Sequence, residues 1–493
     1  MVVVVGAGAS GLGVAWDLLL RGIAVTVVES QEIGRGTSGR FHGLLHSGGR
    51  YVVTDPAAAR QCALENVILR RIAPGAIERT GGYFVSFDDD GDDYVGPWLQ
   101  GARSTGVMTR SVDINRLRTQ IPELSPLARQ AYAVEDSVLE GFELLEMLRQ
   151  NIERAGGTVL THTRLEGVHQ QGGRVAGISV RVGQEKREVA CDALISAAGP
   201  WGGQIAHRFF EDDVDMHLAA GMMLIFANRR VPQIVNRMGT PGDGDILVPH
   251  GETVILGTTN VLQEDPDSPI QTNEQPRYLL TQGEKMFPRM GEWRVLRAFS
   301  GVRPLFGQSV GVGGPDRFSR DFTVLDHGAR GGLKGAFSLV GGKWTTFRLM
   351  AEKASDAVAA FLNISARSTT ATTPLEPIAA VTKGQGPLVC ECENIGLDAL
   401  QKEAAESIDA WRTKTWFAMG PCQGTICGHR GAMIRAQSVG APEALTEFLD
   451  LREERDRGLG KVAWGANARQ LLLNHAIRYQ TLAEGLLNHA KFQ

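Results

Sequence analysis

The sequence has few cysteines, little net charge and no long hydrophobic run. Six cysteines among 493 residues exclude a disulfide scaffold, and in a reducing compartment clustered cysteines more often bind metal. A formal charge of −4 gives no electrostatic reason to expect nucleic acid as a partner. The longest apolar stretch, residues 218–227, is about half of the ~20 residues that a membrane-spanning helix needs. The N-terminal residues also lack a basic leader and a small-residue cleavage site, so we expect a cytoplasmic protein.

The chain is long and rich in glycine. A chain of 493 residues exceeds one ordinary domain of about 100–200 residues, so we expect two or three cores. Its 60 glycines indicate many tight turns and close backbone approaches. A glycine-rich α/β enzyme fits both features.

A β-α-β unit with a nucleotide-binding fingerprint opens the chain. The valine run 2–5 precedes Gly6-Ala7-Gly8-Ala9-Ser10-Gly11, a helix-like stretch to residue 21, a second strand over 23–28, and then Glu29. In such a unit the first glycine permits the tight turn, the second lets the backbone reach a pyrophosphate, and the third allows helix–strand contact. The helix N-terminus favours the anion, and Glu29 would accept hydrogen bonds from a ribose.

Further strands and a linker divide the chain into parts. We predict strands over 157–162, 174–182, 193–197 and 336–340, which makes the nucleotide domain discontinuous. Residues 75–150 and 205–300 would form an α+β cap over the cofactor, completing an oxidoreductase domain over 1–364. Residues 365–386 are predicted to be a linker, followed by a small domain over 387–440 and a helical tail over 441–493. The alternating charges of 451–458 predict a solvated helix face without a function.

Four cysteines lie in two close pairs. Cys390-Glu391-Cys392 precedes Cys422 and Cys427, which gives C-x-C and C-x4-C spacing. Four thiolates can hold zinc or a [2Fe–2S] cluster. The one-residue gap argues against zinc, although zinc and incidental cysteines remain alternatives. We expect Cys62 and Cys191, which have no such neighbours, to be buried small apolar residues.

Three downstream segments resemble the flavin-contacting loops of the D-amino-acid-oxidase-like FAD superfamily. They are Gly36-Thr37-Ser38-Gly39-Arg40, Ser196-Ala197-Ala198-Gly199-Pro200 and Gly341-Gly342-Lys343-Trp344-Thr345-Thr346. The resemblance implies a Rossmann-like FAD-binding domain. It also implies FAD contacts from Gly6, Gly8, Ser10, Gly11, Glu29, Thr37, Ser38, His46, Ala198, Gly199, Gly342, Lys343, Trp344 and Thr345.

A narrower resemblance covers nearly the whole chain. The motifs Leu45-His46-Ser47-Gly48-Gly49-Arg50-Tyr51, Gly301-Val302-Arg303-Pro304 and Ser319-Arg320-Asp321 are similar to those of FAD-dependent glycerol-3-phosphate dehydrogenases, most closely the anaerobic-type catalytic A subunits. One departure is Trp344, where family members often carry leucine. The resemblance implies oxidation of sn-glycerol 3-phosphate to dihydroxyacetone phosphate by hydride transfer to the flavin.

Phosphate recognition suggests roles for the cationic residues of these motifs. A phosphate dianion in a partly dry pocket must be paired, and guanidinium groups match its oxygens bidentately. Arg303 and Arg320 are our first choices for that clamp. As the resemblance implies, Arg50, Tyr51 and Lys343 would line the pocket between the phosphate and the flavin ring. His46 is a candidate for the base, or alternatively a residue that hydrogen-bonds the flavin.

The cysteine spacing resembles the bacterioferritin-associated-ferredoxin-like [2Fe–2S] domain that ends the anaerobic-type A subunits. A flavin accepts two electrons and an iron–sulfur cluster carries one, so the two together convert a hydride into single electrons. By this resemblance the electrons would pass to B-type and C-type subunits and to quinone, which would place the protein at the inner face of the membrane. The alternatives are an amine or imino-acid dehydrogenase of the same superfamily and a non-catalytic electron-transfer subunit.

Overall fold

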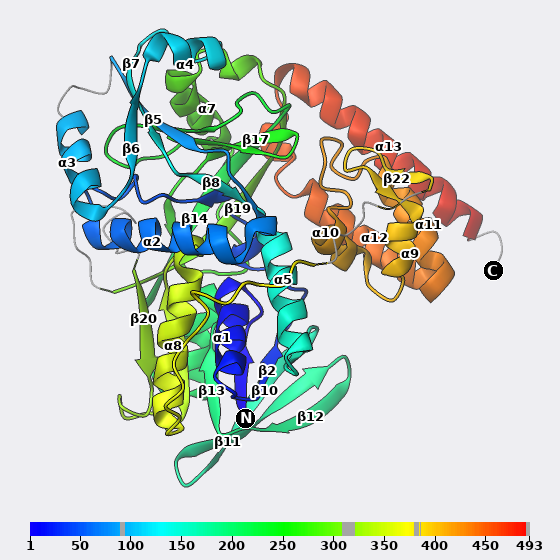
Figure 1. The fold of residues 1–493 in the computed structure, drawn as a ribbon. Helices are drawn as coiled ribbons and strands as arrows, with labels where there is room; N and C mark the ends of the chain where they lie inside the picture. Colours follow the sequence, from blue (N-terminus) through cyan, green and yellow to red (C-terminus); the bar gives the residue numbers. More distant parts are fainter. Residues whose placement is uncertain (89–93, 308–320, 379–383, 385, 490–493) are drawn as a thin grey trace.

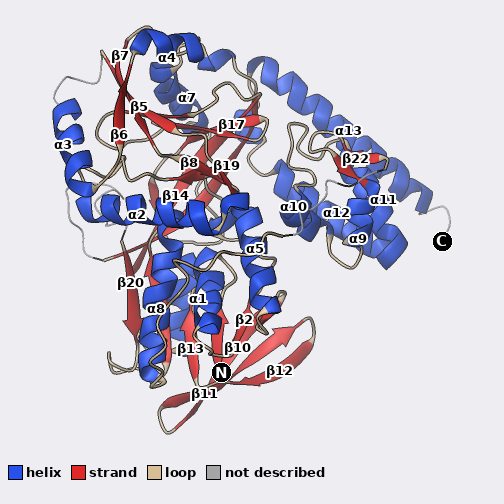
Figure 2. Ribbon diagram, in the orientation of Figure 1, coloured by secondary structure: helices blue, strands red, loops and turns tan. Residues whose placement is uncertain are grey.

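We describe the chain from a computed structural model, which covers residues 1–88, 94–307, 321–378, 384 and 386–489, with side chains described as far as residue 477. Figure 1 shows three parts: a unit of sheet and helices around the N-terminus, a second unit built on a larger sheet, and a C-terminal part beside them. Helices predominate in the C-terminal part, whereas strands run through the other two (Figure 2).

The first unit is built on a six-stranded sheet of order β20-β21-β13-β1-β2-β9. Five strands are parallel, and β20 pairs antiparallel at the edge. The strands are β1 (Val2–Val5), β2 (Val25–Val28), β9 (Thr158–Leu160), β13 (Ala193–Ser196), β20 (Phe322–Asp326) and β21 (Ala336–Gly341). The strands predicted over 2–5, 23–28, 157–162, 193–197 and 336–340 thus occur in this discontinuous sheet, with small differences at their ends. The strand predicted over 174–182 also forms, but it belongs to a separate antiparallel sheet.

Both faces of this sheet are buried, which explains the unbroken valine run of β1. Val2 and Val4 pack into one core with α1 (Ala9–Leu20), α5 (Gly141–Arg154) and α8 (Phe347–Phe361). Val3 and Val5 pack into a second core on the opposite face. That face is covered by α6 (Gly202–Phe209) and by the antiparallel sheet of β10 (Thr163–Gln171), β11 (Arg174–Val182) and β12 (Glu185–Ala190).

The second unit, the cap, is built on a nine-stranded sheet of order β18-β14-β17-β16-β15-β5-β7-β6, with β19 paired to β14. The strands are β5 (Gly82–Phe87), β6 (Thr109–Val112), β7 (Ala128–Val134), β14 (Met216–Ala227), β15 (Ile234–Arg237), β16 (Ile246–His250), β17 (Thr253–Gly257), β18 (Val261–Gln263) and β19 (Val295–Phe306). Apolar side chains of α4 (Ile114–Gln120) and α7 (Gln275–Met286) share a core with this sheet, and α3 (Val95–Thr105) packs in a separate cluster.

Short elements connect the two units. The small sheet of β3 (Leu44–Leu45), β4 (Ile77–Glu78) and β8 (Ser137–Leu139) lies beside α2 (Pro56–Ile72). Single turns of 3-10 helix occur at η1 (Thr37–Gly39), η2 (Pro74–Ala76), η4 (Gly199–Trp201), η5 (Met290–Glu292), η7 (Trp344–Thr346) and η8 (Gly460–Val462).

The C-terminal part has its own apolar core around Trp411 and Phe417. Its elements are β22 (Leu388–Cys390), β23 (Ile395–Gly396), α9 (Leu397–Lys402), α10 (Ile408–Thr415), α11 (Cys427–Val439), α12 (Ala441–Asp456) and α13 (Gly465–His489). The expectation of a solvated face over 451–458 is wrong, because Arg452, Glu454 and Arg455 of α12 are buried. Glu454 lies near Arg35 and Arg40, so its charge faces the rest of the molecule rather than water.

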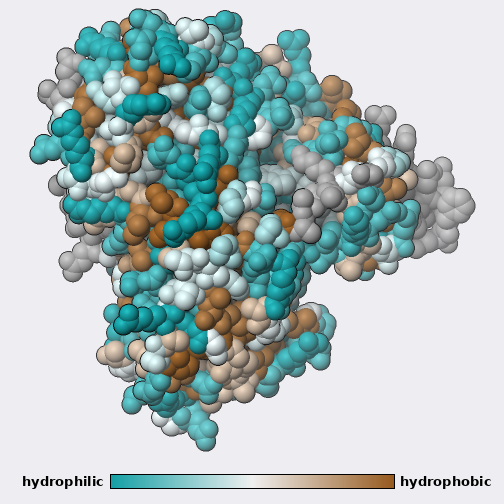
Figure 3. Space-filling model, in the orientation of Figure 1, coloured by the Kyte–Doolittle hydropathy of each residue, from teal (hydrophilic) through white to brown (hydrophobic). Residues whose placement is uncertain are grey.

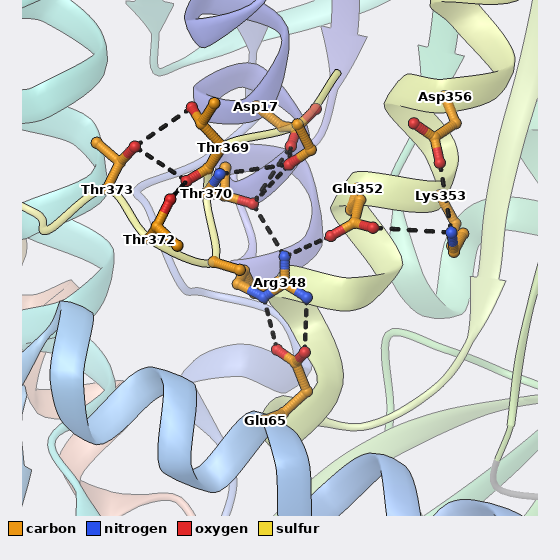
Figure 4. Close-up of polar contacts among 12 residues, drawn as sticks. Asp17, Glu65, Arg348, Glu352, Lys353, Asp356, Thr369, Thr370, Thr372 and Thr373 are labelled. Carbon is orange, nitrogen blue, oxygen red and sulfur yellow. Dashed lines mark hydrogen bonds and ion pairs between the residues drawn. The ribbon is translucent and has the colours of Figure 1, made fainter.

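The first half of the predicted linker is attached to the first unit. The Ser368 hydroxyl donates to Asp17 of α1, and the Leu375 amide donates to the Ile72 carbonyl at 2.8 Å. The Asn151 side-chain amide donates to the Glu376 carbonyl at 3.0 Å. Figure 4 shows this segment beside the polar cluster of α1, α2 and α8. Residues 368–376 therefore follow a defined path across the helices.

Candidate active site

The loop between β1 and α1 has the geometry that binds a pyrophosphate. Gly6 has a φ of +103°, and a Cβ there would lie 2.8 Å from the Ala197 carbonyl oxygen. A Cβ on Gly11 would lie 1.8 Å from the Gly6 carbonyl oxygen, so no larger residue fits. Gly8 is the N-cap of α1, whose N-terminus points its free amides and positive dipole end at this loop.

The side chains of Glu29 and Ser38 hydrogen-bond backbone amides of the glycine loop and of the start of α1. The Glu29 carboxylate accepts hydrogen bonds from the backbone amides of Ala7 at 2.8 Å and Gln31 at 3.0 Å. Burial raises the pKa of Glu29, although these hydrogen bonds oppose the shift. The Ser38 hydroxyl accepts a hydrogen bond from the Ala9 amide at 3.0 Å. The acid at the end of β2 is thus held beside the glycine loop, as the sequence predicts.

These groups line a cavity of about 600 Å³, which we call the nucleotide cavity. Its volume lies within the range of about 300–1,000 Å³ that small-molecule and cofactor sites usually have. Its wall includes most of the residues predicted to contact FAD: Gly6, Gly8, Ser10, Glu29, Thr37, Ser38, Ala198, Gly199, Gly342, Lys343 and Trp344. Gly11, His46 and Thr345 lie outside its wall; the buried Thr345 hydroxyl accepts a hydrogen bond from the His46 amide at 3.1 Å. A dinucleotide fits this glycine-lined, partly apolar space.

Trp344, the residue that departs from the family pattern, closes part of the cavity wall. Its indole nitrogen donates to the Ser38 carbonyl at 2.9 Å. Its ring stacks on Phe41 with centroids 5.3 Å apart, and a Cβ on Gly141 would lie 2.6 Å from Phe41. The tryptophan is therefore fixed by a hydrogen bond and an aromatic neighbour.

A row of polar side chains leads from the nucleotide cavity toward the cap. The Lys343 ammonium lies 5.1 Å from the ring centroid of Tyr51, whose ring is 5.5 Å from that of His46. The His46 ring is in turn 5.9 Å from the ring of His42. The Lys343 nitrogen is buried, and no described residue accepts a hydrogen bond from it. An unpaired buried ammonium is costly, so this position favours an anionic ligand.

His42 is a site residue that no sequence motif pointed to. Burial, together with the positive charges of Arg303 and Arg50, lowers the pKa of His42 to about 3. Its Nδ1 accepts a hydrogen bond from the Leu44 amide at 3.1 Å. The neutral ring therefore carries its proton on Nε2. Its only sequence signal is its place directly before the segment that contains His46.

Arg303 and Arg50 are held by cap residues. Arg303 donates to the Asn260 side chain at 2.9 Å and also hydrogen-bonds the Thr258 hydroxyl. A Cβ on Gly221 would lie 2.3 Å from its guanidinium, so only glycine leaves room for it. Arg50 pairs with Asp245 at 2.6 Å and donates to the Gly242 carbonyl at 3.0 Å.

The structure thus brings several predicted catalytic residues together. Lys343, Tyr51 and His46 form the row described above, and Arg303 and Arg50 lie close enough to His42 to act on its pKa. Arg320 lies outside the described residues. The supporting cap residues come from segments without recognisable motifs, so sequence alone could not single them out.

The four cysteines of the two pairs come together in the C-terminal part. Side-chain contacts join Cys390 to Cys427, Cys427 to Cys422, and Cys422 to Cys392. The hydrogen bond from Cys427, together with amide donors, lowers the pKa of Cys422 to about 5, although burial opposes the shift. Within the described residues, no three or more His, Cys, Asp or Glu side chains surround a point as ligands of a metal ion would. Cys62 and Cys191 are buried, and burial raises the pKa of each to about 11.

Comparison with known proteins places the chain in a class. The family model of FAD-dependent oxidoreductases (DAO) matches residues 1–348, and the chain belongs to this family. It is 34% identical to the A1 subunit of anaerobic glycerol-3-phosphate dehydrogenase from Haloferax volcanii, over 98% of this chain and 90% of that protein. It is also 34% identical to the corresponding A-type chain of anaerobic glycerol-3-phosphate dehydrogenase from Escherichia coli K12, over 95% and 94% of the two chains. The predicted family is therefore confirmed.

A solved structure supports the same fold. The glycerol-3-phosphate dehydrogenase from Bacillus halodurans complexed with FAD matches with a TM-score of 0.67 and 20% identity, covering 93% of this chain and 94% of that one. Among the described helices, none is both long and apolar enough to cross a membrane. Figure 3 shows a face on which hydrophilic side chains predominate and hydrophobic ones lie in scattered patches.

Proposed function

We propose that this protein is an FAD-dependent dehydrogenase that oxidises sn-glycerol 3-phosphate to dihydroxyacetone phosphate. The observation that carries the proposal is the set of cationic groups beside the nucleotide cavity, above all the buried and unpaired Lys343 ammonium. The relatives of similar length named as glycerol-3-phosphate dehydrogenase subunits support the same substrate. Bound FAD would supply the hydride acceptor for the carbinol carbon.

Arg303 is our first candidate for holding the phosphate. Its guanidinium is kept in place by Thr258 and Asn260, so little side-chain entropy is lost when an anion binds. Lys343 would add a second positive charge near the flavin. Arg50 is already paired with Asp245 and would act at longer range. Arg320 stays a sequence-based candidate for the same clamp.

The two histidines suit different parts of the proton transfer. Because Nδ1 of His42 already accepts from the Leu44 amide, its neutral ring can only donate from Nε2. We therefore assign His42 to hold a substrate oxygen. His46 would be the group that takes the hydroxyl proton, and Tyr51 would position its ring.

We further infer that the four clustered cysteines hold a [2Fe–2S] cluster. Such a cluster takes two thiolates at each iron, so it requires two neighbouring pairs rather than four ligands around one ion. The contacts of Cys390 with Cys427 and of Cys392 with Cys422 fit that requirement, as do the amides of Glu393 and Ala418 that donate to Cys390. The cluster would supply one-electron transfer. Because the relatives are named as subunits, we propose B-type and C-type partners that lead to quinone at the membrane.

The test of the substrate is Arg303→Ala, with the exposed Arg187→Ala as the matched control. We expect kcat/KM for glycerol 3-phosphate to fall tens to thousands of fold, because losing one arm of a buried anion clamp costs about 2–5 kcal/mol. Unphosphorylated glycerol should react equally poorly with the parent and the variant. Flavin content per protein should be unchanged, which separates lost binding from lost folding.

Anaerobic bleaching of the flavin distinguishes the alternatives. Glycerol 3-phosphate should bleach the parent, whereas sarcosine, proline and glycerol should not. A parent that is reduced faster by an amine or imino acid, or an Arg303→Ala variant with full activity on the phosphate ester, would refute the proposed substrate. A protein that binds FAD but is bleached by none of these compounds would favour a non-catalytic electron-transfer subunit.

A further inference from the structure

A second cavity, of about 120 Å³, lies between the C-terminal part and the other two units. This volume is several times the space that a single buried water needs. We call it the arginine cavity, because six arginines belong to its wall: Arg35, Arg40 and Arg297 from the first two units, and Arg412, Arg455 and Arg457 from the C-terminal part. Each side of the junction thus contributes three guanidinium groups.

The carboxylates around the arginine cavity cannot pair all of these charges. Glu454 is the only acid among the described residues of the wall, and its oxygens lie between 3.4 and 3.9 Å from the nitrogens of Arg35, Arg40, Arg297, Arg455 and Arg457. Asp409, just behind the wall, pairs with Arg35 at 2.7 Å and Arg412 at 2.9 Å. Glu453, outside the wall, lies 3.9 Å from Arg457. Three carboxylates therefore serve six cations.

Two of the arginines keep buried donors without an acceptor. Arg297 is 4% exposed, and no described residue accepts a hydrogen bond from its Nε or its Nη1. Arg455 is 5% exposed; within the described part of the chain its Nε is likewise unpaired, and its Nη1 contacts the weak acceptor sulfur of Met419 at 3.2 Å. Buried polar groups in native proteins are almost always paired, so these donors indicate a ligand.

The electrostatics of the cavity agree with this geometry. Burial and neighbouring arginines together lower the pKa of Arg297 to about 10, and the same two causes lower the pKa of Arg455 well below its ordinary value. The same arginines hold the pKa of Glu454 at about 2, although burial opposes this. The site therefore has an excess of positive charge, and Arg297, Arg412 and Arg455 carry their part of it on buried side chains.

We propose that the arginine cavity binds a phosphate-type dianion, either inorganic phosphate or the phosphate group of a monoester. Guanidinium forks match phosphate oxygens bidentately, and a space of about 120 Å³ favours a compact anion over an acidic peptide. Because each side of the junction supplies three of the arginines, the bound anion joins the C-terminal part to the catalytic units.

This site is separate from both anion sites of the proposed reaction. The glycine loop that faces the pyrophosphate belongs to the nucleotide cavity, which shares only Gly34, Arg35 and Ser38 with the arginine cavity. Arg297 and Arg303 lie on the same strand, β19, but six residues apart, which is roughly 20 Å along a strand. A phosphate bound by Arg297 is thus not the substrate phosphate.

The test measures binding of inorganic phosphate by calorimetry and by thermal unfolding of the full flavin-containing protein, after extensive dialysis. An Arg303→Ala background removes phosphate binding at the substrate site. In it we compare Arg297→Gln and Arg455→Gln with Arg289→Gln, whose exposed side chain pairs with Glu292. Chloride at equal ionic strength controls for screening.

We expect saturable phosphate binding and a raised Tm in the background protein and in Arg289→Gln. Arg297→Gln and Arg455→Gln should bind at least tenfold more weakly. Without phosphate these two variants should not unfold earlier, because each loses a buried guanidinium whose donors are only partly paired. If either glutamine variant does not fold, Arg297→Lys and Arg455→Lys should show the weaker binding, since an ammonium lacks the fork.

Acid extraction of the purified protein identifies the source of the anion by phosphorus NMR. Recovery of stoichiometric free phosphate, or of a phosphate monoester other than FAD and the substrate, would support the proposal and name its ligand. Binding that is unchanged in both glutamine variants, or the absence of saturable phosphate binding together with an extract free of such phosphate, would overturn it.

Discussion

Arg348 joins the flavin-proximal loop to α2, and its removal should weaken the first unit more than any surface change. The residue is the second of α8, which begins directly after η7, and it is 5% exposed. Its Nη2 and Nε donate to the two oxygens of Glu65 at 2.6 and 2.8 Å, and its Nη1 donates to Glu352 at 2.6 Å and Thr370 at 3.0 Å (Figure 4). One guanidinium therefore connects α8, α2 and the segment after α8.

The expected loss follows from the partner that stays behind. In Arg348→Met the carboxylate of Glu65, whose side chain is 0% exposed, loses its counterion and must either stay buried as an unpaired charge or take up a proton. Breaking a buried ion pair from one side costs about 3–5 kcal/mol. Replacing both partners by apolar residues, in Arg348→Met with Glu65→Leu, should restore most of that loss because no buried charge remains.

Urea unfolding, monitored by flavin fluorescence, measures this loss. The chain has several units that can unfold separately, and the difference in emission between free and bound flavin reports on the unit that binds it. The control is Arg289→Met, which breaks an exposed pair and should change the free energy of unfolding by less than about 1 kcal/mol. An Arg348→Met protein that unfolds together with this control, or a double variant no more stable than the single one, would refute the reasoning.

Two further predictions concern protons and metal. The pKa of His42 is lowered to about 3 in the folded protein, whereas it is near 6.5 in the unfolded chain. Between these two pH values the unfolded chain binds one proton more than the folded protein. The free energy of unfolding should therefore fall by up to about 1.4 kcal/mol per pH unit as the pH is lowered from about 6.5 to about 3, and His42 should add no slope above pH 6.5. Stability measured against pH should show this slope in the parent and a smaller one in His42→Gln; equal slopes would contradict it. Cys390→Ser or Cys427→Ser should remove iron and acid-labile sulfide while FAD stays bound and reducible by substrate. Iron and sulfide retained in both variants, or zinc in the parent, would show that the cluster is misassigned.

Local sequence was enough to predict the nucleotide half of the site. A valine strand buried on both faces, a glycine at positive φ and an acid at the next strand end are each required by short-range geometry. Gly11 illustrates this, because its missing Cβ would collide with the backbone of Gly6 only five residues away. Such constraints fix the number of residues between the glycines and the acid, and this spacing makes the nucleotide-binding motif recognisable in the sequence.

The substrate half depends on neighbours that are distant in sequence. Arg303 is held by Thr258 and Asn260 across a loop, and Gly221 makes room for it on the paired strand. His42 owes its low pKa to burial and to Arg303 and Arg50, which come from separate segments. No local pattern records these contacts, so the motifs indicate the arginines but not the residues that surround them.

The charged run 451–458 shows why a pattern of alternating charges led to a wrong prediction of a solvated helix face. Alternating charges usually belong to a solvated helix, since a buried charge needs a partner. Here Glu454 finds its partners in Arg35, Arg40 and Arg297, all more than 150 residues away in the chain. The sequence contains the charges but not their pairing, which arises only when the C-terminal part packs against the other units.

The position of the arginine cavity bears on how electrons would leave the enzyme. Its wall includes Met419, three residues before Cys422, and Phe41, whose ring stacks on Trp344 of the nucleotide cavity. The same junction therefore separates the flavin-binding wall from the cysteine cluster. Electron transfer between two centres requires that they stay close. Arg35 pairs with Asp409 across the junction, yet the six arginines outnumber the carboxylates that pair with them, which leaves an excess of positive charge there. A bound dianion would neutralise that excess and would help to hold the C-terminal part in position to receive electrons.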